Sequence, residues 1–298
     1  MRRRIAAAVL LFPFVTTCAF GADAPPAPAP SPTKGPHYVI YLLAGQSNMD
    51  GRAKVADLKG PLEKYAKPLP TVLVRFSAGG LKRPLRQNDG FEALRPGFSE
   101  GIPGKPGKAG KPDRPQAECF GPELGFGTRM AQAAPGDKIL LIKFAEGGTS
   151  LSVDWKLDDP KKLYAHFIKF VEATEEKIKA DGGDYEIRGM CWMQGESDSK
   201  LADGAYKSLL SAMIAKTRAD LKLPKLPFVI GQVYDNGQRN FIISAQKAVA
   251  NEVPATAFVE ATGLTTFDKG THYDAASQIE LGNRFAREML RLAPAGKK

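Results

Sequence analysis

The apolar run Tyr38-Val-Ile-Tyr-Leu-Leu-Ala44 leads directly into Gly45-Gln46-Ser47-Asn48-Met49. An unbroken run of this kind is typical of a strand buried on both faces, as in a parallel sheet covered by helices. Where such a strand stops at Gly-x-Ser, the glycine permits a tight turn, and the backbone N–H after it stays free for an anion. The stretch therefore predicts a buried strand with Ser47 as a candidate nucleophile at the rim of the sheet; a helix N-cap is its alternative role.

Four further apolar runs alternate with helical patterns, which predicts one domain, residues 37–293, with a parallel sheet between layers of helices. We therefore expect an α/β protein, a three-layer α/β/α sandwich with about five parallel strands. Ligands of such sheets bind beyond the carboxyl ends of the strands. The expected strands are Tyr38–Ala44, Ile139–Ala145, Ile187–Met193, Phe228–Val233 and Ala255–Val259. The expected helices are Pro122–Ala133, Lys161–Ala180, Ala205–Leu221, Arg239–Asn251 and Ala275–Arg291.

The N-terminal residues do not belong to the predicted domain. Three arginines precede an apolar stretch, Ile5–Val15, and small residues follow it, so residues 1–22 are expected to be a secretory signal peptide. The apolar stretch is too short for a permanent membrane helix, and no stable membrane insertion is expected. Cys18 leaves a lipid anchor as an alternative. Residues 23–36 are rich in Pro and Ala and are expected to form a tether, so the mature protein would be secreted or periplasmic.

The formal net charge of +10 could indicate an anionic partner. No stretch interleaves aromatic residues with Lys and Arg as a nucleic-acid surface would, so nucleic acid is not an expected partner. Some of the charge lies in residues 101–115, where glycine recurs at every third position for four triplets. That is far too short for a collagen triple helix, so we expect an exposed basic loop, either a plain insertion or a contact with substrate.

Two cysteines, Cys119 and Cys191, would remain after export to an oxidising compartment. Cys191 lies within an apolar run, where a buried and unreactive thiol is expected. A disulfide between the two is the alternative, because their distance cannot be read from the sequence.

Four polar blocks accompany Gly45–Met49 further along the chain. They are Gly121-Pro122-Glu123, Glu146-Gly147-Gly148-Thr149-Ser150, Gln194-Gly195-Glu196-Ser197-Asp198 and Gly270-Thr271-His272-Tyr273-Asp274. In this order, from Tyr38 to Leu290, the blocks resemble those of the SGNH hydrolases, specifically the sialate O-acetylesterase-like branch related to carbohydrate esterase family six. Gly-x-Ser alone is common, but its pairing with a downstream Gln-Gly-Glu-Ser-Asp is specific.

A serine nucleophile needs a general base, and the chain has only three histidines. His37 precedes the first expected strand and would lie at the opposite end of the sheet from Ser47. His166 lies in a helical stretch, where a packed or solvated histidine is the default. His272 lies just before the last expected helix, where SGNH proteins keep their base, and it is the predicted base.

The acid that would orient His272 is less regular. SGNH proteins usually carry Asp three residues before the histidine, a position that Lys269 occupies here. Asp268 lies four residues before, and a local bulge at Gly270 would restore the geometry. Asp268 is therefore the predicted orienting acid, and Asp274 or a backbone carbonyl is the alternative.

The resemblance also implies donors for the oxyanion that forms when an ester carbonyl is attacked. They are the backbone N–H of Ser47, a backbone N–H of Gly147 or Gly148, and the side-chain amide of Gln194. The residues expected to support the site are Gln46, Glu123, Glu196 and Asp198. Glu196 and Asp198 would order the Gln194 loop, and a glycosidase-type carboxylate pair is their alternative.

Nothing in the sequence has metal-ligand spacing and no Gly-rich phosphate loop follows a strand, so neither a metal nor a cofactor is expected. The resemblance implies an exported serine esterase that removes O-acetyl groups from a carbohydrate, of the sialate O-acetylesterase or acetylxylan esterase kind. One alternative is a carbohydrate-binding protein on the same scaffold that has lost catalysis, as the displaced Asp268 would suggest. The other is a lipase-like or thioesterase-like SGNH hydrolase, although the loops are polar. The glycan and the oligomeric state are left open.

Overall fold

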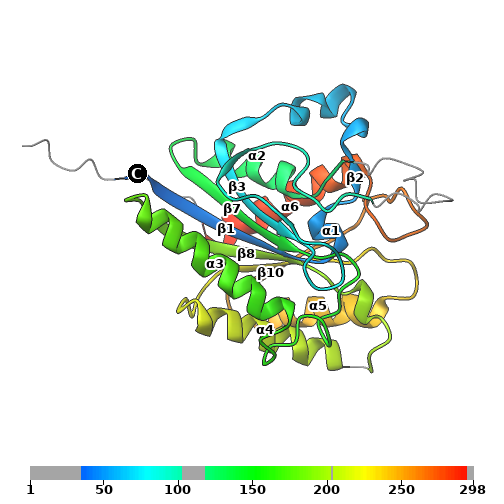
Figure 1. Cartoon of the computed structure of the whole chain (residues 1–298). Coiled ribbons are helices and arrows are strands. Elements are labelled where there is room, and N and C mark those ends of the chain that lie inside the picture. Colours follow the sequence, from blue (N-terminus) through cyan, green and yellow to red (C-terminus); the bar gives the residue numbers. More distant parts are fainter. Residues whose placement is uncertain (1–34, 103–117, 203, 294–298) are drawn as a thin grey trace, which may run out of the picture. The chain divides into compact units, whose positions relative to one another are not determined.

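A mostly parallel sheet between two layers of helices forms the body of the protein (Figure 1). The computed structural model describes residues 35–102, 118–202 and 204–293. Within them, the main sheet has the order β10-β9-β8-β1-β7-β3-β4, and β5 pairs with β3. These strands are β1 (His37–Gly45), β3 (Leu69–Ala78), β4 (Arg86–Gln87), β5 (Glu92–Leu94), β7 (Lys138–Ala145), β8 (Asp184–Met193), β9 (Phe228–Gly231) and β10 (Thr256–Val259). A second, small sheet pairs β2 (Ala53–Lys54) with β6 (Cys119–Phe120).

Both faces of the central strand β1 are buried, because its side chains alternate between two apolar clusters. Even-numbered residues from Tyr38 to Leu42 pack with α3, α4 and α5, and odd-numbered residues from Val39 to Leu43 pack with α2 and α6. The helices are α1 (Ser47–Asp50), α2 (Glu123–Ala133), α3 (Leu163–Ala180), α4 (Ala205–Asp220), α5 (Asn240–Glu252) and α6 (Ala275–Leu292), with 3-10 turns at Val55–Asp57, Gly60–Ala66 and Glu196–Asp198. The three-layer α/β/α prediction is confirmed.

The sheet is wider than the sequence predicted. All five expected strands are present, but β3 is a sixth parallel strand beside β7, and β4 and β5 pair with it antiparallel. Strand β3 lies near the edge of the sheet, so several of its residues are partly exposed, and Arg75 interrupts its apolar run. The criterion of a continuous apolar run therefore missed it, because that criterion detects strands buried on both faces.

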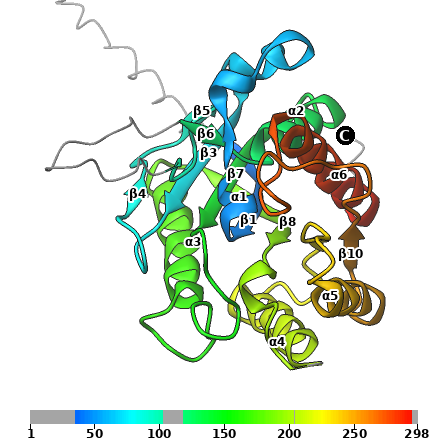
Figure 2. The same cartoon turned by 90° about the vertical axis from the view of Figure 1, so that its right-hand side faces the viewer.

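Three parallel strands end at the same level, and this register builds the site. Gly45 at the end of β1 lies opposite Ala145 of β7 on one side and Met193 of β8 on the other. The residues that come next along each strand are therefore neighbours, although Ala145 and Met193 follow Gly45 by 100 and 148 positions in the chain. Figure 2 shows the loops that leave this edge, with α1 at its centre.

Several predictions concern residues outside the described ranges: the signal peptide 1–22, the anchor at Cys18, nearly all of the tether 23–36 and most of the loop 101–115. Among the described helices, none is long and apolar enough to cross a membrane. Cys119 and Cys191 are both buried and are not joined by a disulfide. They lie in different sheets, β6 and β8, and burial raises the pKa of the Cys191 thiol.

Candidate active site

Ser47 lies at the point where β1 turns into the short helix α1. Its neighbour Gly45 has φ +150°, and a Cβ there would lie 2.1 Å from the carbonyl oxygen of Met193, so only glycine fits this close approach to β8. The backbone N–H of Gln46 then donates to the same Met193 oxygen at 2.9 Å. The turn is thus fixed to the neighbouring strand, and it holds the nearly buried Ser47 hydroxyl at the carboxyl edge of the sheet.

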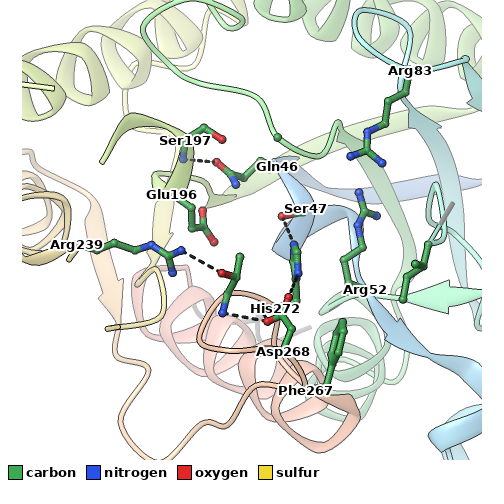
Figure 3. Close-up of a pocket in the computed structure, with 13 residues that line it drawn as sticks. Gln46, Ser47, Arg52, Arg83, Glu196, Ser197, Arg239, Phe267, Asp268 and His272 are labelled. Atoms are coloured by element: carbon green, nitrogen blue, oxygen red, sulfur yellow. Dashed lines mark hydrogen bonds and ion pairs between the residues drawn. The ribbon is translucent and has the colours of Figure 1, made fainter. Parts of the chain in front are cut away.

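The structure brings together the three residues predicted as nucleophile, base and acid (Figure 3). His272 Nε2 lies 3.0 Å from Ser47 Oγ, and His272 Nδ1 lies 2.5 Å from Asp268 Oδ2. Phe267 stacks beside the imidazole, with ring centroids 6.0 Å apart and planes inclined by 18°. Both ring nitrogens therefore have the partners that proton transfer from a serine requires.

Asp268 reaches His272 despite its displacement by one residue. Gly270, with φ +91°, provides the tight turn, and Asp268 Oδ1 accepts the backbone N–H groups of Thr271 at 3.1 Å and His272 at 2.6 Å. Partial burial alone would raise the pKa of Asp268, but these N–H groups and the imidazole hold it below its usual value. Asp274, the alternative, instead caps α6 by accepting the backbone N–H of Ser277 at 2.9 Å.

The predicted backbone donors separate into two groups. The N–H groups of Ser47 and Gly148 have no hydrogen-bond partner among the described residues, and both residues line the pocket. The N–H of Gly147, in contrast, donates to Glu100 Oε1 at 3.0 Å. Of the two glycines, only Gly148 therefore remains a candidate donor to the oxyanion, because the N–H of Gly147 already has a buried acceptor.

The predicted role of Gln194 as a side-chain donor does not fit the structure. Gln194 is completely buried and is not among the described residues that line the pocket. Its Nε2 donates to Asp198 Oδ2 at 2.6 Å, to Thr149 O at 3.1 Å and to Gln46 Oε1 at 3.2 Å. Two N–H groups thus already face three acceptors inside the protein, so none is left for an oxyanion.

Glu196 and Asp198 are both buried, and both order the surrounding loops. Asp198 accepts the Gln194 amide and also holds the loop after β7, through the N–H of Leu151 at 2.6 Å and the hydroxyl of Ser152 at 2.6 Å. Glu196 lines the pocket, whereas Asp198 does not. The two carboxylates therefore do not face each other across the pocket, as a glycosidase pair would.

Asn48 is a functional side chain that the sequence analysis missed. It is fully buried and spans both sides of His272: its Nδ2 donates to Thr271 O at 2.9 Å, and its Oδ1 accepts the N–H of Tyr273 at 3.2 Å. The same Nδ2 donates to Glu196 Oε1 at 2.7 Å. The residue after the nucleophile thus fastens the histidine loop to the turn that carries Ser47. Its place in the Gly-Gln-Ser-Asn motif was the available signal.

A buried ion pair stabilises the turn that carries Ser47. Lys143 Nζ lies 2.7 Å from Glu123 Oε2, and both side chains are fully buried. The ammonium also donates to the carbonyl oxygens of Asp50 at 2.8 Å and Phe98 at 2.6 Å. Burial raises the pKa of Glu123, while Lys143 and the N–H of Gly121 oppose that rise. Glu123 therefore acts through Lys143 on the end of α1, consistent with the predicted supporting role.

The candidate site opens into a pocket of about 520 Å³ that three arginines line. Arg52 pairs with Asp50 and, at 2.8 Å, with Glu100, and Arg83 lies 3.1 Å from the same Glu100 carboxylate. Arg239 is also buried, but it donates only to carbonyl and hydroxyl oxygens and has no ion-pair partner among the described residues. Among the residues that the structure describes, no group of three or more His, Cys, Asp or Glu side chains could hold a metal ion.

Comparisons with known proteins find carbohydrate esterases that this chain resembles. A family model described as "Carbohydrate esterase, sialic acid-specific acetylesterase" matches residues 37–291. A probable carbohydrate esterase of Arabidopsis thaliana is 27% identical over 282 residues, covering 91% of this chain and 95% of that protein. The X-ray structure of the Arabidopsis protein matches with a TM-score of 0.64 at 25% identity, over 86% of this chain and 98% of that chain. The crystal structure of NanS shares the fold, with a TM-score of 0.61 at 18% identity, over 87% and 98%.

Proposed function

The chain belongs to the family of carbohydrate esterases described as sialic acid-specific acetylesterases, which makes it a carboxylic ester hydrolase, and we propose that it removes O-acetyl groups from a carbohydrate through an acyl-enzyme on Ser47. One observation supports this proposal above all others. Ser47, His272 and Asp268 form an unbroken hydrogen-bonded series at a pocket that Gly148 also lines, and the N–H groups of Ser47 and Gly148 have no partner among the described residues.

In the proposed first step, Ser47 Oγ attacks the acetyl carbonyl carbon and its proton passes to His272 Nε2. The carbonyl electron pair moves onto oxygen, and the backbone N–H groups of Ser47 and Gly148 stabilise the resulting charge. The ionised Asp268 holds Nδ1–H and stabilises the imidazolium. When the tetrahedral intermediate collapses, the bond to the sugar oxygen breaks and His272 returns the proton to that oxygen.

In the second step, His272 takes a proton from water, and the water oxygen attacks the acetyl group on Ser47. Acetate leaves, and the proton returns to the serine oxygen. To test the proposal, the enzyme would be quenched during turnover of p-nitrophenyl acetate and digested, and the peptides analysed by mass spectrometry. We expect an acetyl group on the peptide that contains Ser47; turnover without this adduct would contradict the acyl-enzyme.

For the substrate, we propose an O-acetylated sugar acid such as an acetylated sialic acid, rather than neutral acetylated xylan. Arg239 supports this choice, because its buried guanidinium lines the pocket and forms no ion pair with a carboxylate among the described residues, so it is suited to bind a substrate carboxylate. The test compares 9-O-acetyl-N-acetylneuraminic acid with its methyl ester, on which only the charge is removed. We expect KM to rise at least about tenfold for the ester, which corresponds to the loss of one charge-assisted hydrogen bond. An equal KM, or faster acetate release from xylan, would contradict it.

Two rival functions can be separated by simple assays. A catalytically impaired carbohydrate-binding protein would bind the acetylated sugar without releasing acetate, and the hydrogen bond between Asp268 and His272 removes the reason for suspecting it. A lipase-like or thioesterase-like enzyme would hydrolyse p-nitrophenyl octanoate or acyl thioesters faster than p-nitrophenyl acetate. We expect acetate to be the preferred acyl group.

Export of the protein is a further proposal. It is supported by the sequence of residues 1–22, in which three arginines precede an apolar stretch and small residues. Fractionation of cells that express the whole chain, followed by N-terminal sequencing, should find the protein outside the cytoplasm and shortened near residue 22. A full-length cytoplasmic product would contradict export.

A further inference from the structure

The oxyanion donors described above lack a side-chain amide, because Gln194 is already engaged. Both the nitrogen and the oxygen of the Gln194 amide point toward partners in the protein interior. Its two N–H groups meet the oxygens of Asp198, Thr149 and Gln46, and its Oε1 lies 3.0 Å from the donating hydroxyl of Tyr206. Turning the amide over would set its oxygen against the Asp198 carboxylate. The orientation of Gln194 is therefore determined by its partners.

Gln46 has the opposite arrangement. Its Oε1 accepts three hydrogen bonds, from Gln194 Nε2 at 3.2 Å and from the backbone N–H groups of Gly195 and Ser197 at 3.4 Å each. If the amide were turned over, its NH2 group would face three donors, and the buried N–H of Gly195 and the partly buried N–H of Ser197 would lose this acceptor. The oxygen must therefore point toward the Gln194 loop, so the nitrogen points away from it.

The free end of the Gln46 amide lies at the candidate site. Gln46 lines the same pocket as Ser47, His272 and Gly148, and its Nε2 has no hydrogen-bond partner among the described residues. In Figure 3 the oxygen of Gln46 is joined to Ser197, and the nitrogen lies on the side of Ser47 and Glu196. The side chain is only 2% exposed and follows directly on the turn that carries the nucleophile.

We propose that Gln46 Nε2 is the side-chain donor to the oxyanion, together with the N–H groups of Ser47 and Gly148, and that Gln194 is the positioning residue that orients it. This inference rests on the proposed esterase function. Three hydrogen bonds hold the Gln46 amide before substrate arrives, so its dipole needs no reorganisation when negative charge develops on the carbonyl oxygen. Asp198 and Thr149 fix Gln194, and Gln194 fixes Gln46.

The substitution Gln46→Glu tests the donor without removing its support. A glutamate keeps an oxygen toward Gln194, Gly195 and Ser197, and it replaces only the nitrogen that faces the pocket. We expect kcat for p-nitrophenyl acetate to fall by about 10²- to 10³-fold, the loss typical of one oxyanion donor, with KM within about threefold. The melting temperature should change little. An unchanged kcat would overturn the proposal.

The substitution Gln194→Ala is the matched control. It removes one of the three donors that orient Gln46 and leaves the other two, so its kcat should fall at least about tenfold less than that of Gln46→Glu. Active sites would be counted by stoichiometric reaction with diethyl p-nitrophenyl phosphate, which corrects for misfolded enzyme. A larger loss of kcat per active site in Gln194→Ala would return the donor role to Gln194 and overturn the proposal.

A structure of the wild-type protein labelled with the same phosphate ester needs no variant. In a diethylphosphoryl adduct on Ser47, the phosphoryl oxygen stands where the oxyanion would be. We expect Gln46 Nε2 within about 3.2 Å of this oxygen and Gln194 Nε2 beyond hydrogen-bonding distance. A labelled Ser47 whose phosphoryl oxygen is bound by Gln194, or by no side-chain amide, would overturn only this inference. Failure to label Ser47 would overturn the proposed function together with it.

Discussion

The two ends of the sheet carry the same pair of side chains in very different surroundings. At the amino end, His37 Nδ1 lies 2.5 Å from Asp184 Oδ1, and at the carboxyl end His272 Nδ1 lies 2.5 Å from Asp268 Oδ2. The side chains of the first pair are 52% and 44% exposed, and those of the second 25% and 35%. Within the described part of the chain, only His272 of these two has a serine hydroxyl on its other ring nitrogen.

The backbone around the two pairs also differs. Asp268 accepts two backbone N–H groups, and the amide of Asn48 holds both neighbours of His272. His37 and Asp184 instead face each other across the first register position of β1 and β8. A histidine–carboxylate contact is thus not a catalytic site by itself; it also needs the nucleophile, the hydrogen bonds that hold the acid, and the loop that holds the base.

The substitution Ser47→Ala should abolish activity, because it leaves a histidine–carboxylate pair at each end of the sheet and a nucleophile at neither. We expect kcat for p-nitrophenyl acetate to fall by several orders of magnitude, on the order of 10⁶-fold as for other serine hydrolases. The thermal melting curve should stay unchanged, since only one oxygen atom is lost. Activity above a few per cent of wild type would show that Ser47 is not the nucleophile.

The substitution Asp268→Asn keeps the shape of the pair but removes the charge that stabilises the imidazolium. It should lower kcat by about 10³- to 10⁴-fold, the range known for orienting acids of serine hydrolases. KM should change much less. The matched control is Asp184→Asn at the other end of the sheet, which should leave both constants as in the wild type. Equal effects of the two substitutions would contradict the assignment.

The substitution Asn48→Ala tests the backbone support of His272. Without its amide, the carbonyl of Thr271 and the N–H of Tyr273 lose their partner, and the histidine loop is free to shift. We expect a loss of about 10- to 100-fold in kcat, as for a displacement of a catalytic group by about 1 Å. Asn283→Ala on α6, whose amide contacts Glu280 at 3.4 Å, is the control and should retain full activity.

The pH dependence of stability should also separate the wild type from Asp268→Asn. The folded pKa of Asp268 lies below its usual value of 3.8, so its carboxylate contributes stability above that value and loses it as the pH falls through the folded pKa. Below about pH 4, the difference in melting temperature between the two proteins should therefore shrink as the pH falls. A difference that stays constant or grows between about pH 4 and 2 would contradict the shift.

The substitution His37→Ala is expected to have the smallest effect. Its contact with Asp184 is exposed, and such pairs contribute about 0 to 1 kcal/mol to stability. We expect kcat and KM equal to those of the wild type, and a melting temperature lowered by no more than a few degrees. A loss of activity without unfolding would mean that the amino end of the sheet takes part in function.

The sequence was most informative where local pattern and local chemistry coincide. Continuous apolar runs identified the five strands buried on both faces, and the elimination of His37 and His166 pointed to His272. Asp268 could be reached by the same local logic, because a glycine turn of four residues joins it to the histidine. Strand β3, next to the edge of the sheet, was missed because some of its residues are partly exposed and Arg75 interrupts its apolar run.

The amides and the backbone donors could not be assigned in this way. Gln46 and Gln194 both follow buried strands, and each carries an identical amide. Only the hydrogen bonds formed where β1 and β8 end side by side show that the NH2 group of Gln194 faces three acceptors and the amide oxygen of Gln46 three donors. The N–H of Gly147 is likewise engaged by the carboxylate of Glu100, which lies 47 positions away in the chain, whereas that of Gly148 has no partner among the described residues.

The α/β architecture, the candidate nucleophile and base, and the family could thus be predicted from the amino-acid sequence, because strand burial and short motifs are properties of neighbouring residues. The tertiary structure decided which donors remain free for an oxyanion and which are engaged by the protein. The physical reason is that a hydrogen-bonding group is available to substrate only if no buried partner has used it. In this protein those partners come from other strands, which are brought together by the register of β1 with β7 and β8.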